Sequence, residues 1–183
     1  MIFRMAPTDP PILWLDMEMT GLDPERCVPL QIAGVITRSD LEEEASVEVT
    51  IWQPDEELSR MVPVVRDMHA KNGLTERVRT SRHDTAHAER AVLELVAARC
   101  GPGAAVLAGN SIHQDRRFLA RYFPALEGYL HYRMIDVSSI KELVRRWYGK
   151  DATYSKGDVP HTALADIRAS IDEMRYYRKH YFR

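Results

Sequence analysis

Residues 10–22, PPILWLDMEMTGL, place two carboxylates inside an otherwise apolar run. The segment Ile12–Met19 has the length and composition of a β-strand. Strand side chains alternate between two faces, so Asp16 and Glu18 share a face with Trp14, about 6–7 Å apart, while the leucines and methionines at 13, 15, 17 and 19 share the other. If the first face is open to water, this is an ordinary polar strand face. If it is covered, the two anions need a cation, because burying unpaired charges is costly.

Length, composition and charge bound the class of protein. The chain has 183 residues, of which 45% are hydrophobic and 28% charged. We therefore expect a single globular domain over residues 1–183, with residues 1–10 flexible. The net charge of −2 argues against a protein that coats long duplexes through phosphate contacts, since that mode needs a basic surface. A short anionic substrate held by a metal ion is still compatible with this charge.

Two features of the sequence predict a cytoplasmic protein. Cys27 and Cys100 are far apart and lack metal-type spacing, as expected for buried thiols in a reducing compartment. No run approaches the roughly 20 apolar residues of a membrane span, and the amino terminus lacks the apolar segment of a secretory signal. We expect neither a disulfide framework nor a membrane association.

The first half of the chain reads as three strands followed by helices. The strand-like segments are residues 12–19, 30–37 and 45–54, with turn signals at GLDP and at the acidic RSDLEEE, residues 38–44. Such a series predicts an antiparallel meander. The middle is helical, with a break at Pro63, a stop at KNG and a longer amphipathic helix over about 84–99. His83 and His87 have the spacing of one helix face, but no third zinc ligand is near them.

In the second half, strands and helices alternate. The stretches AAVLAGN (104–110) and RMIDV (133–137) read as short buried strands that each lead into a helix. A last helix is predicted over about 162–181. Strands first and alternating strands and helices later predict an α/β fold, with a mixed sheet and helices on its faces.

Two further acids stand at the starts of predicted helices. Asp115, in GNSIHQDRRF (109–118), follows a buried strand, although a helix N-terminal acid favoured by the macrodipole explains it equally well. Asp166, in HTALADIRAS (161–170), lies in the opening turns of the last helix. His161 is five positions earlier, or about 500° of helical rotation, so the two side chains converge only if His161 stands on the loop or cap.

A mixed sheet can bring these four carboxylates and the histidine to one edge. Four carboxylates cannot share a site without hard cations, and oxygen-rich sites suit Mg²⁺ or Mn²⁺. Two such ions, roughly 3.5–4 Å apart, form the clamp used in phosphodiester hydrolysis. A histidine with a reference pKa of about 6.5 is suited to accept a proton from the attacking water.

Four stretches of the chain resemble the oligoribonuclease family of DnaQ-like DEDDh exonucleases: WLDMEMTGLD, AGNSIHQDRRFLARYFPALEGYLHYR, DVSSIKELVRRW and HTALADIRASIDEMRYYR. The likeness runs from about Ile12 to Tyr177. It implies an RNase H-like fold with a mixed five-stranded sheet, a homodimer, two divalent ions and 3′-to-5′ hydrolysis of very short RNA. The family's acids and histidine fall on Asp16, Glu18, Asp115, Asp166 and His161.

The same resemblance implies a substrate pocket. Leu22 matches a leucine that wedges between two bases, and His69 matches a histidine that contacts substrate. The residues that match the cap around a 5′-phosphate are Ser111, Arg133, Ser138 and Ser139, and Tyr132 matches an aromatic that reaches the partner subunit's site. Such a cap would close the groove to longer chains. Without the resemblance, Leu22 is equally explained as core, the two adjacent serines as a helix cap and the arginine as one end of a surface ion pair.

Two positions depart from the family pattern. Val64 stands where many relatives carry an aromatic residue, which bears on how the 3′ base is stacked. Gln31 stands where many relatives have glutamate, which bears on support of the metal site. The five catalytic positions are unchanged.

We therefore expect an exoribonuclease that cuts 5′-phosphorylated dinucleotides and similarly short RNA to nucleoside 5′-monophosphates, with His161 as general base. One alternative is a DNA-proofreading-type 3′-to-5′ exonuclease of the same superfamily, which should tolerate long DNA strands. The other is a non-catalytic module that binds short oligonucleotides. The intact acid set and His161 argue against that module, because a binder needs no proton acceptor.

Overall fold

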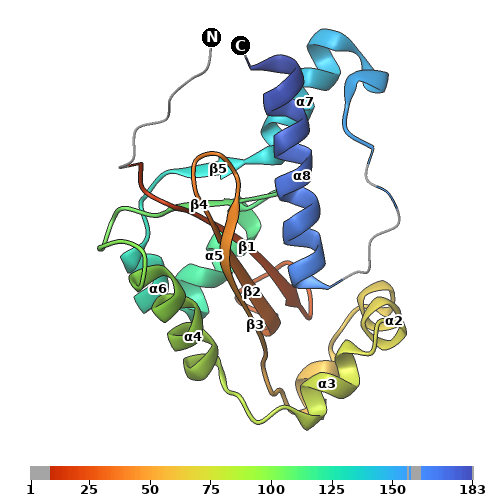
Figure 1. Cartoon of the computed structure of the whole chain (residues 1–183). Helices are drawn as coiled ribbons and strands as arrows, with labels where there is room; N and C mark the ends of the chain where they lie inside the picture. The colour runs from red at the N-terminus through yellow and green to blue at the C-terminus, as the bar shows by residue number, and fades with distance from the viewer. Residues whose placement is uncertain (1–8, 156, 158–161, 183) are drawn as a thin grey trace.

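The computed structural model describes residues 9–155, 157 and 162–182, and its centre is one five-stranded sheet (Figure 1). The strand order is β3-β2-β1-β4-β5. The strands are β1 (Ile12–Met19), β2 (Pro29–Thr37), β3 (Glu43–Thr50), β4 (Val106–Gly109) and β5 (Met134–Asp136). Strands β1, β2 and β3 pair antiparallel, whereas β4 pairs parallel with both β1 and β5. The prediction of a mixed five-stranded sheet is therefore confirmed.

Helices cover both faces of this sheet. They are α1 (Asp55–Ser59), α2 (Pro63–Lys71), α3 (Leu74–Thr80), α4 (Thr85–Ala97), α5 (His113–Tyr122), α6 (Pro124–Tyr129), α7 (Val137–Tyr148), the 3₁₀ turn Lys150–Ala152 and α8 (Ala163–Tyr181). The predicted break at Pro63 is the first residue of α2, a position where the missing N–H costs nothing. None of the described helices is long and apolar enough to cross a membrane.

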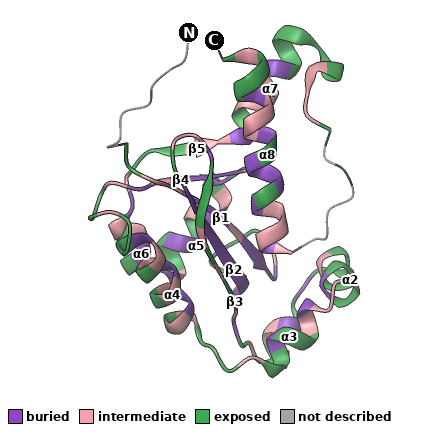
Figure 2. Cartoon of the chain, viewed as in Figure 1, coloured by how far each residue is buried: buried purple, intermediate pink, exposed green. Residues whose placement is uncertain are grey.

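The two faces of β1 pack against different layers, as the alternation of its side chains predicts. Leu13, with the other odd-numbered side chains of the strand, joins a core with Val92 of α4 and Phe118 of α5. Trp14 instead joins a core with Ile167 of α8. Figure 2 shows β1 and β2 buried between these layers. Asp16 and Glu18 point toward the α8 side, so their strand face is covered by a helix.

Strand β3 differs from its prediction at both ends. It begins at Glu43, inside the segment expected to be a turn, and ends at Thr50 rather than near residue 54. The acidic start is held in the strand because both oxygens of Glu43 accept from the Arg168 guanidinium of α8, at 3.0 and 3.2 Å. The Glu43–Arg168 ion pair therefore holds the start of β3 against α8, the helix that carries Asp166.

Gly109 ends β4 at a point of close approach to β1. A Cβ atom there would lie 2.9 Å from the Leu15 carbonyl oxygen and equally close to the Ile112 side chain. Glycine therefore lets β4 lie directly against β1, and the chain then turns into α5 with Asp115 in the first turn.

Two expectations fall on parts of the chain that the structure does not describe. Residues 1–8, most of the segment expected to be flexible, lie outside the described residues. His161 also lies outside them.

Candidate metal centre and active site

Three carboxylates from the two ends of the chain converge beside β1. Asp16 and Glu18 come from the strand, and Asp166 comes from the first turn of α8. One ligand oxygen from each lies within 4.8 Å of the other two. The start of α8 is set by Thr162, whose side chain accepts a hydrogen bond from the Ala165 N–H. Oxygen donors in this number and spacing suit a hard divalent cation.

The protonation of Glu18 reflects this crowding. The pKa of Glu18 is raised to about 7, mainly by burial and then by the negative charge of Asp166, while the nearby Arg77 opposes the rise. Arg77 is therefore a site neighbour that sequence reasoning missed, because only the fold brings α3 to the end of β1. A bound cation would favour the ionised form of Glu18, so these residues fit a divalent metal ion.

The fourth predicted acid, Asp115, lies against the backbone between the two acids of β1. Its Oδ1 accepts a hydrogen bond from the Met17 N–H at 3.0 Å, and only 6% of the residue is exposed. The pKa of Asp115 is raised to about 7, mainly by burial, with backbone hydrogen bonds opposing the rise and the charge of Glu18 contributing to it. Asp115 is outside the group of three carboxylates that share mutual 4.8 Å distances. It is therefore a neighbour of that cluster, held in place by the strand.

His69 is fully buried next to Glu18. Its Nε2 lies 3.0 Å from the Met19 carbonyl oxygen, and its Nδ1 lies 3.9 Å from Glu18 Oε2. Burial lowers the pKa of His69, which favours the neutral imidazole. The role expected for it, contact with substrate, stays a prediction.

Gln31, one of the two departures from the family pattern, is the residue directly opposite Glu18 in the sheet. Its Nε2 donates to Thr50 Oγ1 at 3.2 Å. Its Oε1 is buried and accepts no hydrogen bond from any residue within the described ranges. An uncharged amide thus borders the carboxylate cluster on this side.

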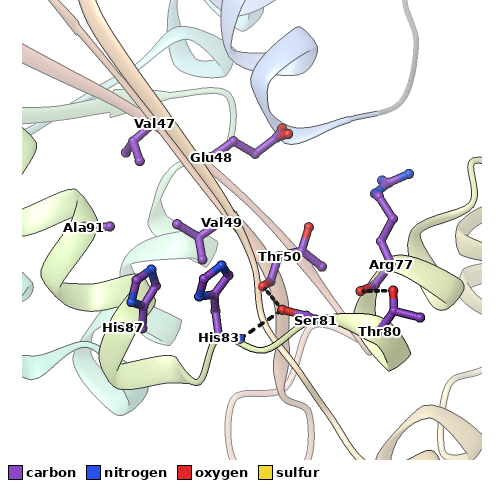
Figure 3. A pocket seen from close by; sticks show the side chains of 10 residues that line it. All are labelled: Val47, Glu48, Val49, Thr50, Arg77, Thr80, Ser81, His83, His87 and Ala91. Atoms are coloured by element: carbon purple, nitrogen blue, oxygen red, sulfur yellow. Dashed lines mark hydrogen bonds between the residues drawn. The ribbon is translucent and has the colours of Figure 1, made fainter.

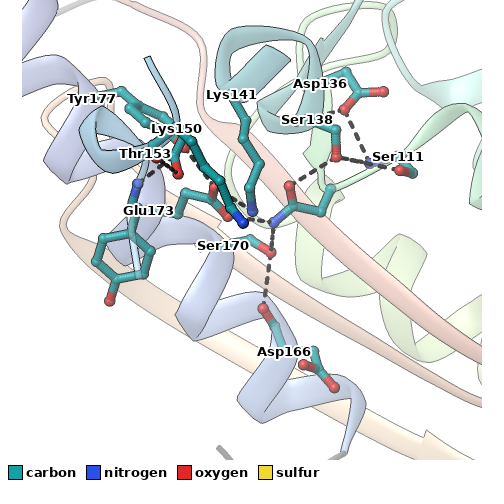
Figure 4. A network of polar contacts seen from close by, with 12 residues as sticks. Ser111, Asp136, Ser138, Lys141, Lys150, Thr153, Asp166, Ser170, Glu173 and Tyr177 are labelled. Atoms are coloured by element: carbon teal, nitrogen blue, oxygen red, sulfur yellow. Dashed lines mark hydrogen bonds and ion pairs between the residues drawn. The ribbon is translucent and has the colours of Figure 1, made fainter. Parts of the chain in front are cut away.

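Two of the serines expected to bind a terminal phosphate lie side by side: Ser111, just before α5, and Ser138, in the first turn of α7 (Figure 4). The Ser111 N–H donates to Asp136 Oδ1 and to Ser138 Oγ, both at 3.0 Å. Asp136 also caps α7 by accepting from the Ser138 N–H at 2.9 Å, so the cap is the aspartate rather than the serines. An acid directly before a helix is the signal that could have identified it. Ser139 is exposed in the next position.

Other predicted contact residues are on the surface. Leu22 is 66% exposed, which excludes the alternative that it is core, and Val64 is also exposed. Tyr132 is 72% exposed, and the Arg133 guanidinium lies over its ring at 5.4 Å from the centroid. Within the described part of the chain, Arg133 therefore has an aromatic neighbour and forms no surface ion pair of the kind considered from sequence.

A separate hollow of about 530 Å³ lies between β3 and the segment that joins α3 to α4 (Figure 3). Glu48 and Arg77 are on its wall, but none of the four predicted acids lines it. His83 and His87 stack here with ring centroids 4.1 Å apart. They do not share a helix as predicted, because the Asp84 side chain caps α4 and the helix begins after it.

Comparison with known proteins covers nearly the whole chain. The RNase_T exonuclease family model matches residues 13–174. The chain is 46% identical over 173 residues to an oligoribonuclease of Hahella chejuensis, covering 94% of this chain and 95% of that protein. It is 51% identical over 174 residues to an oligoribonuclease of Mycobacterium ulcerans, covering 92% and 80% of the two chains.

Solved structures show the same fold. Escherichia coli exonuclease I, in a zinc-bound complex with single-stranded DNA, superposes with a TM-score of 0.73 at 14% identity. The match covers 96% of this chain but 42% of the exonuclease I chain, so this protein spans about two fifths of that neighbour. The likeness confirms the predicted RNase H-like, DnaQ-type fold. From the family match and the relatives together, the chain belongs to the exonuclease family that includes the oligoribonucleases.

Proposed function

We propose that this protein is a 3′-to-5′ exoribonuclease of the oligoribonuclease type, which hydrolyses dinucleotides and other very short RNA to nucleoside 5′-monophosphates. The observation that carries the proposal is the convergence of Asp16, Glu18 and Asp166, with ligand oxygens within 4.8 Å of one another. The names of the relatives, at 43–51% identity, agree with this activity.

The proposed site holds two divalent ions, Mg²⁺ or Mn²⁺, on Asp16, Glu18, Asp115 and Asp166. When bound, such ions lower the pKa of water and stabilise charge on phosphodiester oxygens. The chain's own contribution is to position these four carboxylates. The Met17 N–H orients Asp115 by donating a hydrogen bond to its carboxylate, and the Thr162 cap sets where α8, the helix of Asp166, begins.

His161 is the proposed general base. It directly precedes the α8 cap in the sequence, and a neutral imidazole can take the proton of the attacking water at a ring nitrogen. Loss of that proton makes the water a better nucleophile toward the terminal phosphodiester.

Preference for short substrates would come from the other end of the site. Ser111, Ser138, Ser139 and Arg133 are proposed to surround a 5′-phosphate. Leu22, with its exposed side chain, is proposed to wedge between the two bases, and His69 to contact substrate from beside Glu18. A guanidinium can make two charge-assisted hydrogen bonds to a terminal phosphate. A site bounded by metal ions and by these groups leaves room for few nucleotides.

We further propose that the working unit is a cytoplasmic homodimer, in which Tyr132 of each subunit reaches the other's site. Tyr132, Met134, Leu143 and Trp147 are large hydrophobic side chains with exposed fractions between 40% and 72%. A two-fold interface would remove such side chains from water. Cys27 and Cys100 are free thiols that are only partly buried, rather than buried as expected, and unpaired thiols suit a reducing compartment.

The direct test uses 5′-labelled RNAs of two to about ten nucleotides, incubated with and without Mg²⁺ or Mn²⁺ and resolved by length. The expected result is metal-dependent removal of 3′ nucleotides, fastest for the dinucleotide. The matched pair Asp166→Asn and Asp172→Asn changes one cluster acid and one exposed acid of the same helix. Only the first should abolish cleavage. Efficient degradation of long DNA, or no cleavage with any metal, would contradict the proposal.

A further inference from the structure

A half-buried network of polar side chains joins the helix of Asp166 to Ser138, at the start of α7, and through it to Ser111 (Figure 4). Its centre is Asn110, which follows β4. The Asn110 Nδ2 donates to Ser170 Oγ at 2.9 Å and to Glu173 Oε2 at 3.2 Å, both on α8. Its Oδ1 accepts from Ser138 Oγ, on α7, at 3.0 Å. One amide thus bridges the two helices that carry the two ends of the proposed site.

The direction of every hydrogen bond in this bridge is determined. Ser170 donates its hydroxyl hydrogen to the Asp166 carbonyl oxygen at 2.9 Å, so its oxygen accepts from Asn110. An ionised Glu173 can only accept. Both hydrogens of the Asn110 amide therefore face α8, and its oxygen must face Ser138.

Glu173 is held equally firmly. It is 3% exposed, and its Oε1 accepts from the Tyr177 hydroxyl at 2.9 Å and pairs with Lys141 Nζ at 3.1 Å. Lys141 is on α7 and Glu173 on α8, so this ion pair, in which Glu173 is buried and the Lys141 side chain is 45% exposed, is a second bridge between the same helices. A buried carboxylate with three donors around its two oxygens does not reorient without leaving charges unpaired.

The network also helps to set the backbone conformation and the hydrogen bonds of Ser111. Because Ser138 donates its hydrogen to Asn110, its oxygen accepts the Ser111 N–H. That contact helps to hold Ser111 at φ 51°, a left-handed conformation that is rare for residues other than glycine. The Ser111 N–H is fully used. Its exposed hydroxyl lies 3.3 Å from Ser138 Oγ and donates to it here, so it would have to turn from that contact to donate to an incoming phosphate.

We propose that Asn110, held by Glu173, is a positioning residue that fixes the separation between the Asp166 carboxylate and the Ser111–Ser138 pair, and thereby the length of oligonucleotide the site prefers. This inference rests on the function proposed above. A site that must fit a metal-bound phosphodiester at one end and a 5′-phosphate at the other discriminates length only if its two ends do not move relative to one another.

The test compares kcat/KM for a 5′-phosphorylated dinucleotide and a 5′-phosphorylated pentanucleotide in wild type and in Asn110→Ala. In the variant, the ratio of dinucleotide to pentanucleotide should fall by about tenfold or more, because misplacement of one end penalises only the substrate that uses both. Mn²⁺ affinity measured by calorimetry should stay near the wild-type value, since all four acids remain.

Two other variants make the result decisive. Glu173→Gln keeps the side-chain size but can place an N–H donor opposite the Asn110 N–H, which needs an acceptor. The ratio of kcat/KM for the dinucleotide to kcat/KM for the pentanucleotide should therefore fall in this variant as well. Tyr122→Phe removes hydrogen bonds to Cys27 O and Pro24 O, away from the network, and should lower the melting temperature without changing the ratio.

The failures are distinguishable. If wild type has no preference for the dinucleotide, the proposed function is wrong and the inference falls with it. If wild type has the preference and folded Asn110→Ala and Glu173→Gln both keep it, the inference alone is overturned. Loss of Mn²⁺ affinity with an unchanged ratio would also overturn it, because the network would then serve the metal site.

Discussion

The Asp115 carboxylate accepts its hydrogen bond from the one main-chain N–H that lies between Asp16 and Glu18 on β1. The bond joins α5 to the strand across 98 positions of sequence. It orients Asp115 Oδ1 toward the strand. The fourth acid is therefore placed by the backbone of the strand that carries the first two.

Because of this hydrogen bond, Asp115→Asn tests whether the negative charge of Asp115 is needed for activity. Asparagine can still accept from the Met17 N–H, so the fold should survive, while the anionic ligand is lost. We expect kcat/KM to fall by about 10²–10⁴, the range that corresponds to several kcal/mol of transition-state stabilisation. Steady-state kinetics with circular dichroism would check this. Near wild-type rates in folded protein would exclude Asp115 from the metal site.

The stability of metal-free protein should fall as the pH rises from about 4 to above 7. The pKa values of Glu18 and Asp115 are raised to about 7 in the folded state. Groups that hold protons more tightly when folded stabilise the protein at low pH and lose that contribution as pH passes their folded pKa. In EDTA, the melting temperature should be lower at pH 8 than at pH 5.5. Glu18→Gln should flatten this difference, and an unchanged slope would show that Glu18 does not carry it.

Saturating Mn²⁺ should counteract the loss of stability at higher pH. The ion binds the deprotonated carboxylates, so it should raise the melting temperature more at pH 8 than at pH 5.5. Differential scanning fluorimetry at both pH values, with Asp172→Asn as the control acid, measures the effect. Equal stabilisation by Mn²⁺ in wild type and Asp166→Asn would argue against the carboxylate cluster as its site.

Replacing His161 should separate chemistry from binding. Loss of a general base typically costs about 10²–10⁴ in rate, and it removes no ground-state contact. His161→Ala should therefore slow single-turnover cleavage while dinucleotide affinity, measured by calorimetry, stays nearly constant. A parallel loss of affinity would indicate a substrate-binding role instead.

Arg133→Ala should weaken recognition of a terminal phosphate. The variant should lower kcat/KM for the 5′-phosphorylated dinucleotide by about tenfold or more, as expected for a lost charged hydrogen bond. The unphosphorylated dinucleotide should change much less. Lys at this position keeps the charge but not the two-pronged geometry, and we expect intermediate activity. Equal loss on both substrates would rule out a phosphate contact.

Light scattering should report twice the 21.0 kDa chain mass. Tyr132→Ala should lower activity in a protein that still dimerises, because the ring is proposed to act in the partner's site. Trp147→Glu should instead dissociate the subunits, because it places a charge in the proposed interface. A fully active monomer would contradict both expectations.

Much of the fold followed from local pattern. The alternation along Ile12–Met19 correctly separated Trp14 from the leucines and methionines, because each face of a central strand contacts a different layer. The acids of β1 and the first turn of α8 were likewise identified by position within their elements. Such assignments need only the period of a strand and the start of a helix.

What the sequence could not supply was contact between distant side chains. Nothing local to Glu43 indicates that Arg168 will hold it in β3, and the acidic run was therefore assigned to a turn. Asn110, Lys141 and Glu173 have ordinary neighbours in the sequence, and their relation depends on how α7 and α8 pack on the sheet. His69 is similar, because only the tertiary structure buries it beside Glu18.

The carboxylate cluster draws on residues near both ends of the sequence, which bears on when the enzyme becomes active during its synthesis. Asp16 is translated long before Asp166. A nascent chain can form the β1–β2–β3 meander early, since domains begin to fold from the amino-terminal side. It cannot complete the site until α8 has been translated and has packed against β1. A nascent chain that has not yet reached α8 therefore lacks the cluster of Asp16, Glu18 and Asp166.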